Sequence, residues 1–139
     1  MSKFVLESDL ERESFDWGGV GWRCSPTTTS SSQLTVMDVT LSPGGGHAFH
    51  RHPDQEEMII VKEGQVEQWI EDDKQVLDVG DSVYIDAGVV HASFNDGDAD
   101  ARLQVVLGPC VGEIGYELED VSDQEPWSAL RKEGAPGPA

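Results

Sequence analysis

The chain has 139 residues and a formal net charge of −18, from 27 acidic and 9 basic side chains. This length predicts one domain with a single hydrophobic core. A strongly acidic surface repels phosphate backbones and anionic lipids, so we expect no nucleic-acid and no membrane partner. No apolar run approaches the ~20 residues of a membrane-spanning helix and no secretory signal is visible, so we expect a cytoplasmic protein.

Short apolar runs separated by turn residues predict an all-β domain. We expect N-terminal strands over residues 3–41, the first of them at Lys3–Leu6, and the last strands over residues 101–119. The final residues, 132–139, are rich in Gly, Pro and Ala, and a disordered tail is expected there. The folded domain should therefore cover residues 1–131.

Two tryptophans, Trp17 and Trp22, lie in a Gly-rich segment after a charged stretch at residues 7–14 that we expect to be a loop. We expect these indoles to close one end of the β structure or a subunit interface, and the alternative is that one of them lines a ligand pocket. The next strand, over residues 34–41, alternates apolar and polar positions, which predicts one buried face.

Metal-ligand residue types are concentrated between residues 44 and 64. Residues two apart on a β-strand point to the same face, so His50 and His52 should project together. A turn through Pro53 follows, because Pro cannot donate to a central ladder. The returning strand then brings Glu57 back beside the two imidazoles.

Two neighbouring side chains leave alternatives open. Glu56 is also near the two imidazoles in sequence, but Glu57 shares its strand parity with an inward apolar face and is preferred; a slip at the turn would exchange the two. His47 differs in parity from His50 and His52. We expect His47 at the rim or on the surface, with a role as a pocket acid or base as the alternative.

The following strand carries a polar residue on its inward face. Val66 and Ile70 mark the inward parity, which places Gln68 inside as well. A buried polar side chain should be hydrogen-bonded, so Gln68 is a candidate to orient a metal ligand or to contact a substrate. The alternative is a position at the end of the β structure that still meets water. Trp69 has the other parity and should face a second sheet or a partner chain.

A fourth candidate ligand lies in a second segment, residues 80–95. His91 is the only His outside residues 47–52, and a turn before it should deliver it to the same ion. Ser93 shares parity with His91 and is a candidate to reach the pocket. Three imidazoles and one carboxylate suit one divalent transition metal with positions left open, and this set does not choose among Fe, Mn, Ni, Cu and Zn.

The two segments together resemble the two-motif pattern of the cupin family. The first reads Gly-x5-His-x-His-x4-Glu-x6-Gly over residues 44–64, and the second reads Gly-x5-Asp-x-Gly-x2-His-x3-Asn over residues 80–95. Only Asp86 departs from the pattern, which usually has Pro there, and we expect this to affect a turn and not the metal. The resemblance implies a single cupin domain, a double-stranded β-helix (jelly-roll) barrel with a metal inside. It also implies a homodimer, for which the candidate contacts are Trp17, Trp22 and Trp69.

The resemblance implies no single reaction, because one fold hosts many functions. A divalent ion with open positions can polarise a carbonyl or an enediol, or activate O2 as Fe2+. We expect a metal-dependent cupin that acts on a small oxygenated organic molecule, with a dioxygenase-type oxidation as the first hypothesis. The alternatives are a non-catalytic cupin that binds a small molecule through its metal, and a sugar or keto-acid isomerase.

Overall fold

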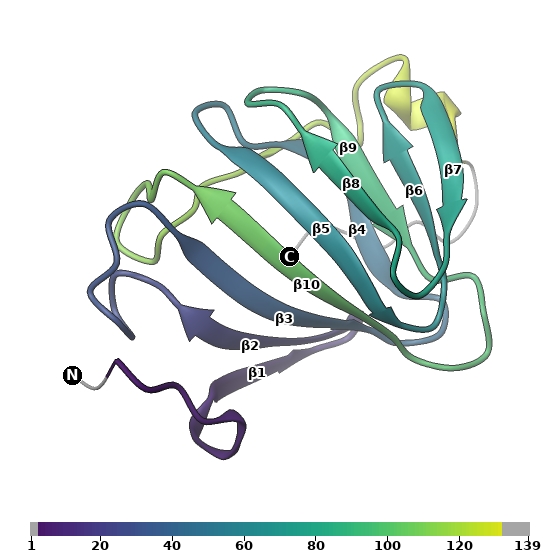
Figure 1. Cartoon of the computed structure of the whole chain (residues 1–139). Coiled ribbons are helices and arrows are strands. Elements are labelled where there is room, and N and C mark those ends of the chain that lie inside the picture. Colours follow the sequence, from purple (N-terminus) through teal and green to yellow (C-terminus); the bar gives the residue numbers. More distant parts are fainter. Residues whose placement is uncertain (1–2, 132–139) are drawn as a thin grey trace.

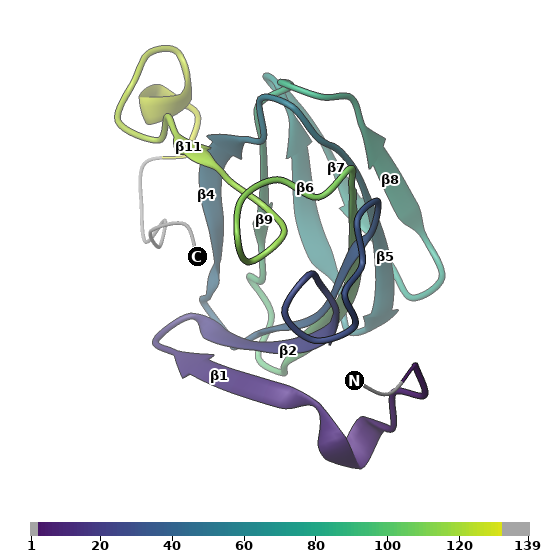
Figure 2. The same ribbon diagram turned by 90° about the vertical axis from the view of Figure 1, so that its left-hand side faces the viewer.

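The computed structural model describes residues 3–131 and shows two antiparallel sheets that face each other (Figure 1). The larger sheet has the strand order β1-β2-β3-β10-β5-β8, and the second sheet has the order β11-β4-β9-β6-β7. The view turned by 90° shows the sheets curving around a common interior (Figure 2). The all-β prediction is confirmed, and the tail predicted at residues 132–139 lies outside the described residues.

The larger sheet consists of β1 (Glu11–Phe15), β2 (Gly18–Cys24), β3 (Thr35–Leu41), β5 (Glu56–Glu63), β8 (Ser82–Ile85) and β10 (Ala101–Gly108). The second sheet consists of β4 (Gly46–Arg51), β6 (Val66–Ile70), β7 (Asp73–Leu77), β9 (His91–Phe94) and β11 (Glu119–Asp120). The helical content of the described residues is limited to two 3-10 turns, η1 (Glu7–Asp9) and η2 (Trp127–Ala129). None of the described helical segments has the length and apolar character needed to cross a membrane.

The first and last strands of the chain differ from those predicted from the sequence. The strand expected at Lys3–Leu6 is not formed, and β1 instead occupies Glu11–Phe15, largely within the charged stretch predicted as a loop. All five residues of β1 are exposed, because an edge strand of this kind has no buried face, and it therefore shows no apolar alternation. The strand expected near residues 113–119 is reduced to β11, Glu119–Asp120.

The interior is apolar on the side of the larger sheet. Strands β3 and β10 alternate buried and partly buried residues along their whole length, as a period of two requires. Leu41, Val61 and Leu107 are fully enclosed in this cluster. On the opposite side of the interior, β4 and β9 direct polar side chains inward. The interior therefore has one apolar wall and one polar wall.

A second apolar cluster covers the outer face of β4, β9 and β6. Trp69 and Phe94 are buried there beneath the C-terminal segment, from which Trp127 packs against the cluster. Arg131 lies 3.9 Å over the Phe94 ring and forms an ion pair with Asp96. Trp69 is thus covered by the chain's own C-terminal segment.

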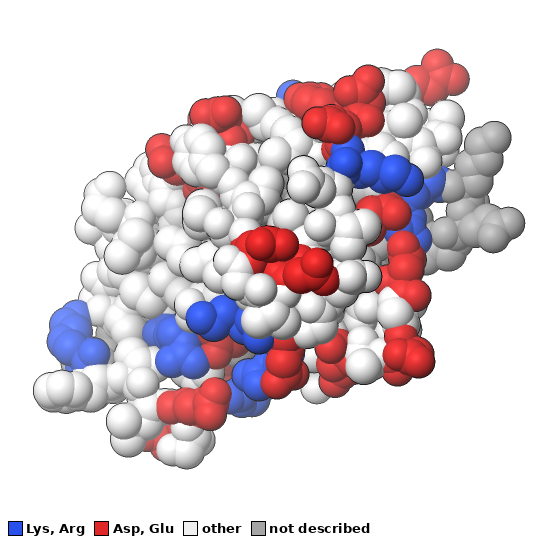
Figure 3. All heavy atoms as spheres, turned by 45° about the vertical axis from the view of Figure 1, so that its right-hand side comes forward, with Lys and Arg blue, Asp and Glu red and all other residues white. Residues whose placement is uncertain are grey.

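The surface matches the acidic composition. Figure 3 shows Asp and Glu side chains spread over one face of the molecule, with fewer Lys and Arg side chains among them. Some of the basic side chains are paired with acids, as in the contact of Arg51 with Glu119 at 2.9 Å. Arg51 thus points away from the cavity that the two histidines on either side of it face.

Candidate metal centre

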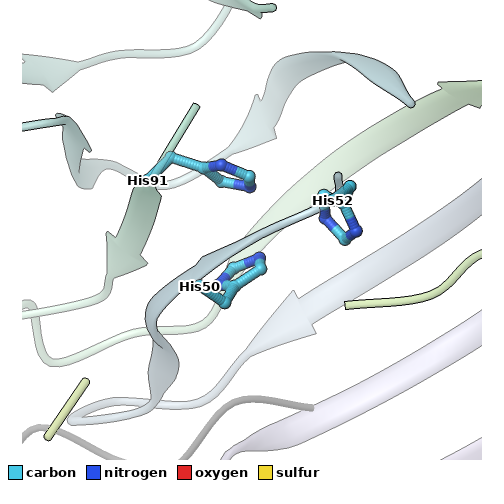
Figure 4. Close-up of side chains that lie close together, drawn as sticks. All are labelled: His50, His52 and His91. Atoms are coloured by element: carbon cyan, nitrogen blue, oxygen red, sulfur yellow. The ribbon is translucent and has the colours of Figure 1, made fainter. Parts of the chain in front are cut away.

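Three histidine side chains meet inside the barrel. His50 lies on β4, His52 follows the end of β4, and His91 begins β9; Figure 4 shows their rings facing one another. His50 and His91 are directly opposite each other in the antiparallel pairing of β4 with β9. One ring nitrogen of each of the three lies within 4.8 Å of the other two, and each residue is at most 5% exposed. The structure thus brings together the three histidines that the spacing singled out.

Each of these imidazoles is oriented by a backbone carbonyl. The Nδ1–carbonyl distances are 2.7 Å for His50 to Ala48, 2.8 Å for His52 to Glu117 and 3.0 Å for His91 to Val89. A carbonyl oxygen only accepts, so Nδ1 carries the proton in each ring. In a neutral ring this leaves the lone pair on Nε2, which is the arrangement that orients a histidine toward a metal.

The carboxylate of Glu57 reaches the same place from β5. Its Oε1 lies 3.3 Å from Nε2 of His52 and 2.8 Å from Nε2 of His91. With the His91 proton on Nδ1, no hydrogen lies between Oε1 of Glu57 and Nε2 of His91, so both atoms are buried without a hydrogen-bond partner. Glu56 is exposed and accepts from the Tyr84 hydroxyl at 3.4 Å. Of the two neighbouring acids, Glu57 faces the histidines.

The charges at this site are strongly coupled. Burial acts to raise the pKa of Glu57, but the attraction of His91 and the contacts of His52 outweigh it and hold that pKa well below its usual value. Burial also opposes the charge of His91, yet the Glu57 carboxylate raises the pKa of His91 above the usual value. Burial, followed by repulsion from the other imidazoles, lowers the pKa of His50 well below the usual value.

The four side chains fit a divalent transition metal. They offer three imidazole nitrogens and one carboxylate oxygen, a set used for such ions. Two of the donor atoms, on Glu57 and His91, are buried with no hydrogen-bond partner, whereas buried polar atoms in folded proteins are nearly always satisfied. An ion bound between His50, His52, Glu57 and His91 would satisfy them, and it could act there as a Lewis acid. The donor set does not distinguish Fe, Mn, Ni, Cu and Zn.

His47 lies where the strand parity did not place it. It is half-buried and lines the cavity, with its ring centroid 6.1 Å from that of His50, whereas strand parity placed it on the other face of β4. The reason is a β-bulge: His47 pairs with Ser93 and His50 pairs with His91, so β4 has one extra residue over this interval. The extra residue turns both histidines to the same face. Burial is the main reason why the pKa of His47 is lowered to about 4.

Gln68 and Ser93 form a buried polar pair beside the histidines. The Ser93 hydroxyl donates to Oε1 of Gln68 at 2.6 Å, and both residues are buried. Ser93 lines the cavity, as its parity with His91 predicted, whereas Gln68 lies behind it and is outside the lining. Gln68 is therefore connected to the cavity through its hydrogen bond with Ser93.

The turn before His91 forms without the usual proline. Asp86 accepts from the backbone N–H of Val89 at 3.2 Å, and Gly88 adopts a positive φ of 80°. The N–H of Gly88 donates to the carbonyl of His52 at 2.9 Å, which ties the second motif to the first. The turn therefore forms with Asp86 at the position where the family pattern usually has Pro.

The segment between β10 and β11 covers the cavity, a contact that strand alternation does not indicate. Gln55 is buried and donates to the carbonyls of Pro109 and Gly115 at 2.8 and 2.9 Å, which holds the segment over the histidines. Tyr116 then lines the cavity, with its ring 6.0 Å from that of His52. A polar residue in a predicted turn is the only sequence feature that marks Gln55.

The cavity is narrow and mostly apolar. The free space between its atoms is about 510 Å³ with the open mouth included. Such a space accommodates a small ligand and little water. Its apolar lining includes Val20, Met37, Val39, Ile59, Leu103 and Leu118.

Comparison with known proteins identifies the class. The chain belongs to the cupin domain family, whose model matches residues 37–107. It is also 33% identical over 108 residues to Protein SchB from Streptomyces halstedii, an alignment that covers 78% of each chain.

Solved structures show the same fold at low identity. KdgF from Halomonas sp. has a TM-score of 0.70 at 15% identity, over 78% of this chain and 96% of that one. An RmlC-like cupin from Shewanella frigidimarina has a TM-score of 0.69 at 18% identity, over 79% of this chain and 93% of that one. A Bacillus subtilis oxalate decarboxylase has a TM-score of 0.69 at 18% identity, but this chain covers only 31% of it. The predicted cupin barrel is therefore confirmed.

Proposed function

We propose that this chain is a metal-dependent cupin in which His50, His52, Glu57 and His91 hold one divalent transition metal beside a small oxygenated organic ligand. The observation that carries the proposal is the convergence of four buried donor side chains, two of which contain atoms without a hydrogen-bond partner. The fold relative from B. subtilis, oxalate decarboxylase, has Mn(II) centres. That likeness supports the choice of a divalent ion and not the choice of reaction.

A dioxygenase-type oxidation is the reaction that we propose first. When bound, the metal would supply a site for O2 and for a substrate oxygen. The residues of the chain would provide the surroundings for that chemistry: the apolar side chains limit water, and the carbonyls behind each Nδ1 keep the ligand rings in place. Ser93, braced by Gln68, is positioned to hydrogen-bond a substrate oxygen.

Non-catalytic binding of a small molecule is the second candidate. It is favoured by the shortage of groups that could move a proton in the cavity. Apart from the proposed metal ligands, the polar side chains that line the cavity within residues 3–131 are those of His47, Ser93 and Tyr116. A sugar or keto-acid isomerase, the third alternative, needs an acid or base for each proton that it moves, and this lining offers few.

Anaerobic loading of the protein with each candidate metal, followed by an oxygen electrode, separates these functions. Phenols, keto acids and uronates would be offered in turn, with His50→Ala as the metal-site control. Substrate-dependent O2 uptake that is lost in His50→Ala is the expected result. Turnover without O2 uptake would replace oxidation by isomerase or lyase chemistry. Ligand-induced thermal shifts without any turnover would favour the binding protein.

A further inference from the structure

The cavity offers no positive side chain to an anionic ligand. Its lining, among the residues that the structure describes, includes no Lys and no Arg. A divalent ion held by one carboxylate and three neutral imidazoles carries a net charge of about +1. That charge balances one anionic oxygen of a ligand. A second carboxylate on the ligand would be buried without a partner, which is costly in an apolar cavity.

His47 offers the ligand a second polar contact. Its Nε2 is buried and has no hydrogen-bond partner in the described structure, although the ring lines the cavity. Trp17 holds the ring from the side, edge-on at 4.4 Å between centroids, so the imidazole cannot turn freely. A buried nitrogen that is left unpaired is costly, so a ligand atom that hydrogen-bonds it gains affinity.

The apolar wall faces the body of the ligand. Val20, Met37 and Val39 from the larger sheet lie across the cavity from the histidines and carry no hydrogen-bonding group in their side chains. A sugar has hydroxyls on all sides and would leave several of them unpaired against this wall. A hydrocarbon ring or chain would be favoured there, because its burial removes apolar surface from water.

We infer that the ligand of this cavity is a small phenol or enol with a hydrocarbon body, which places one oxygen at the metal and bonds Nε2 of His47 through a second polar group. This inference rests on the proposed function. The 6.1 Å between the ring centroids of His47 and His50 is a distance that one such molecule can span. His47 is then the residue that selects among phenols, whereas the charge of the site excludes dianions.

Binding calorimetry on the metal-loaded full chain tests the inference with three probes. Resorcinol has two hydroxyls on one ring and phenol has one. Fumarate is a dianion of similar size whose trans carboxylates cannot both reach one ion. We expect the order of affinity to be resorcinol, phenol, fumarate. His47→Phe keeps the ring beside Trp17 and removes Nε2, so it should weaken resorcinol binding by about tenfold and leave phenol binding unchanged.

His47→Gln retains a polar side chain and should recover part of the resorcinol affinity. Thermal unfolding and metal content, measured on the same samples, establish that each variant is folded and loaded. Equal loss of both phenols in His47→Phe, or fumarate binding as tight as resorcinol binding in wild type, would overturn the inference. A chain that takes up no metal would instead defeat the proposed function, and the ratio of resorcinol to phenol affinity in that metal-free chain would still report on His47.

Discussion

The burial of His47 predicts a specific loss of stability in acid. In the metal-free protein the pKa of His47 is about 4, lowered mainly by desolvation, against 6.5 for an ordinary His. The unfolded chain therefore binds a proton as the pH falls through 6.5, whereas the folded chain does not until about pH 4. Stability falls over this interval, and one pKa unit corresponds to about 1.36 kcal/mol. The full loss is about 3 kcal/mol, of which about 2 kcal/mol has occurred by pH 5.

His47→Gln removes this titration and leaves the other histidines in place. Their contributions differ in sign, since the pKa of His50 is lowered and that of His91 is raised. They largely cancel in the difference between the two proteins, because repulsion from His47 is one of the smaller causes of the His50 shift. For a chain of this size 2 kcal/mol corresponds to roughly 7 °C in Tm. Thermal unfolding in the presence of a chelator, at pH 7.5 and pH 5.0, measures it.

We expect wild type to lose about 7 °C more than His47→Gln between these two pH values. The same loss in both proteins would mean that His47 is protonated in the folded state at pH 5. In that case the β-bulge would not bury the imidazole, and the reasoning from the structure would be refuted.

Three further outcomes are expected. A divalent metal at 100 times its Kd should raise the Tm of wild type and of Glu56→Gln by roughly 9 °C. Glu57→Gln should lose most of this shift in the same melting experiment. Equal shifts in the two variants would contradict the choice of Glu57 as the metal ligand. Ser93→Ala leaves Gln68 without its 2.6 Å hydrogen bond, so urea unfolding should show a loss of about 1–3 kcal/mol, and an unchanged midpoint would refute that pairing. We predict a homodimer, so light scattering should give twice the mass of one chain. The mass of a single chain would contradict this prediction.

The sequence predicted the parts of the site that obey strand alternation. His50, His52 and His91 face one space because each keeps the parity of its strand, and Glu57 shares the inward face of β5 with Ile59. Alternation is a local rule, so it is readable from the chain as long as no residue is inserted. The same rule located the buried face of β3.

The parts that were missed depend on contacts that sequence alternation does not record. Strand parity placed His47 on the other face of β4 because it does not include the bulge, which adds one residue. No feature of the sequence marks where that residue lies. Strand β1 was missed because it is an exposed edge. Tyr116 reaches the cavity through the hydrogen bonds of Gln55 to a segment that is about sixty residues away in the chain.

The metal content of the purified chain tests the central claim most directly. Protein prepared without a chelator, or reconstituted anaerobically and then desalted, would be assayed by elemental analysis beside the His50→Ala/His91→Ala double variant. Four convergent donors predict about one divalent ion per chain in wild type and almost none in the double variant. The same metal content in both proteins, or no uptake by folded wild type at saturating metal, would contradict the claim that these side chains form a metal centre.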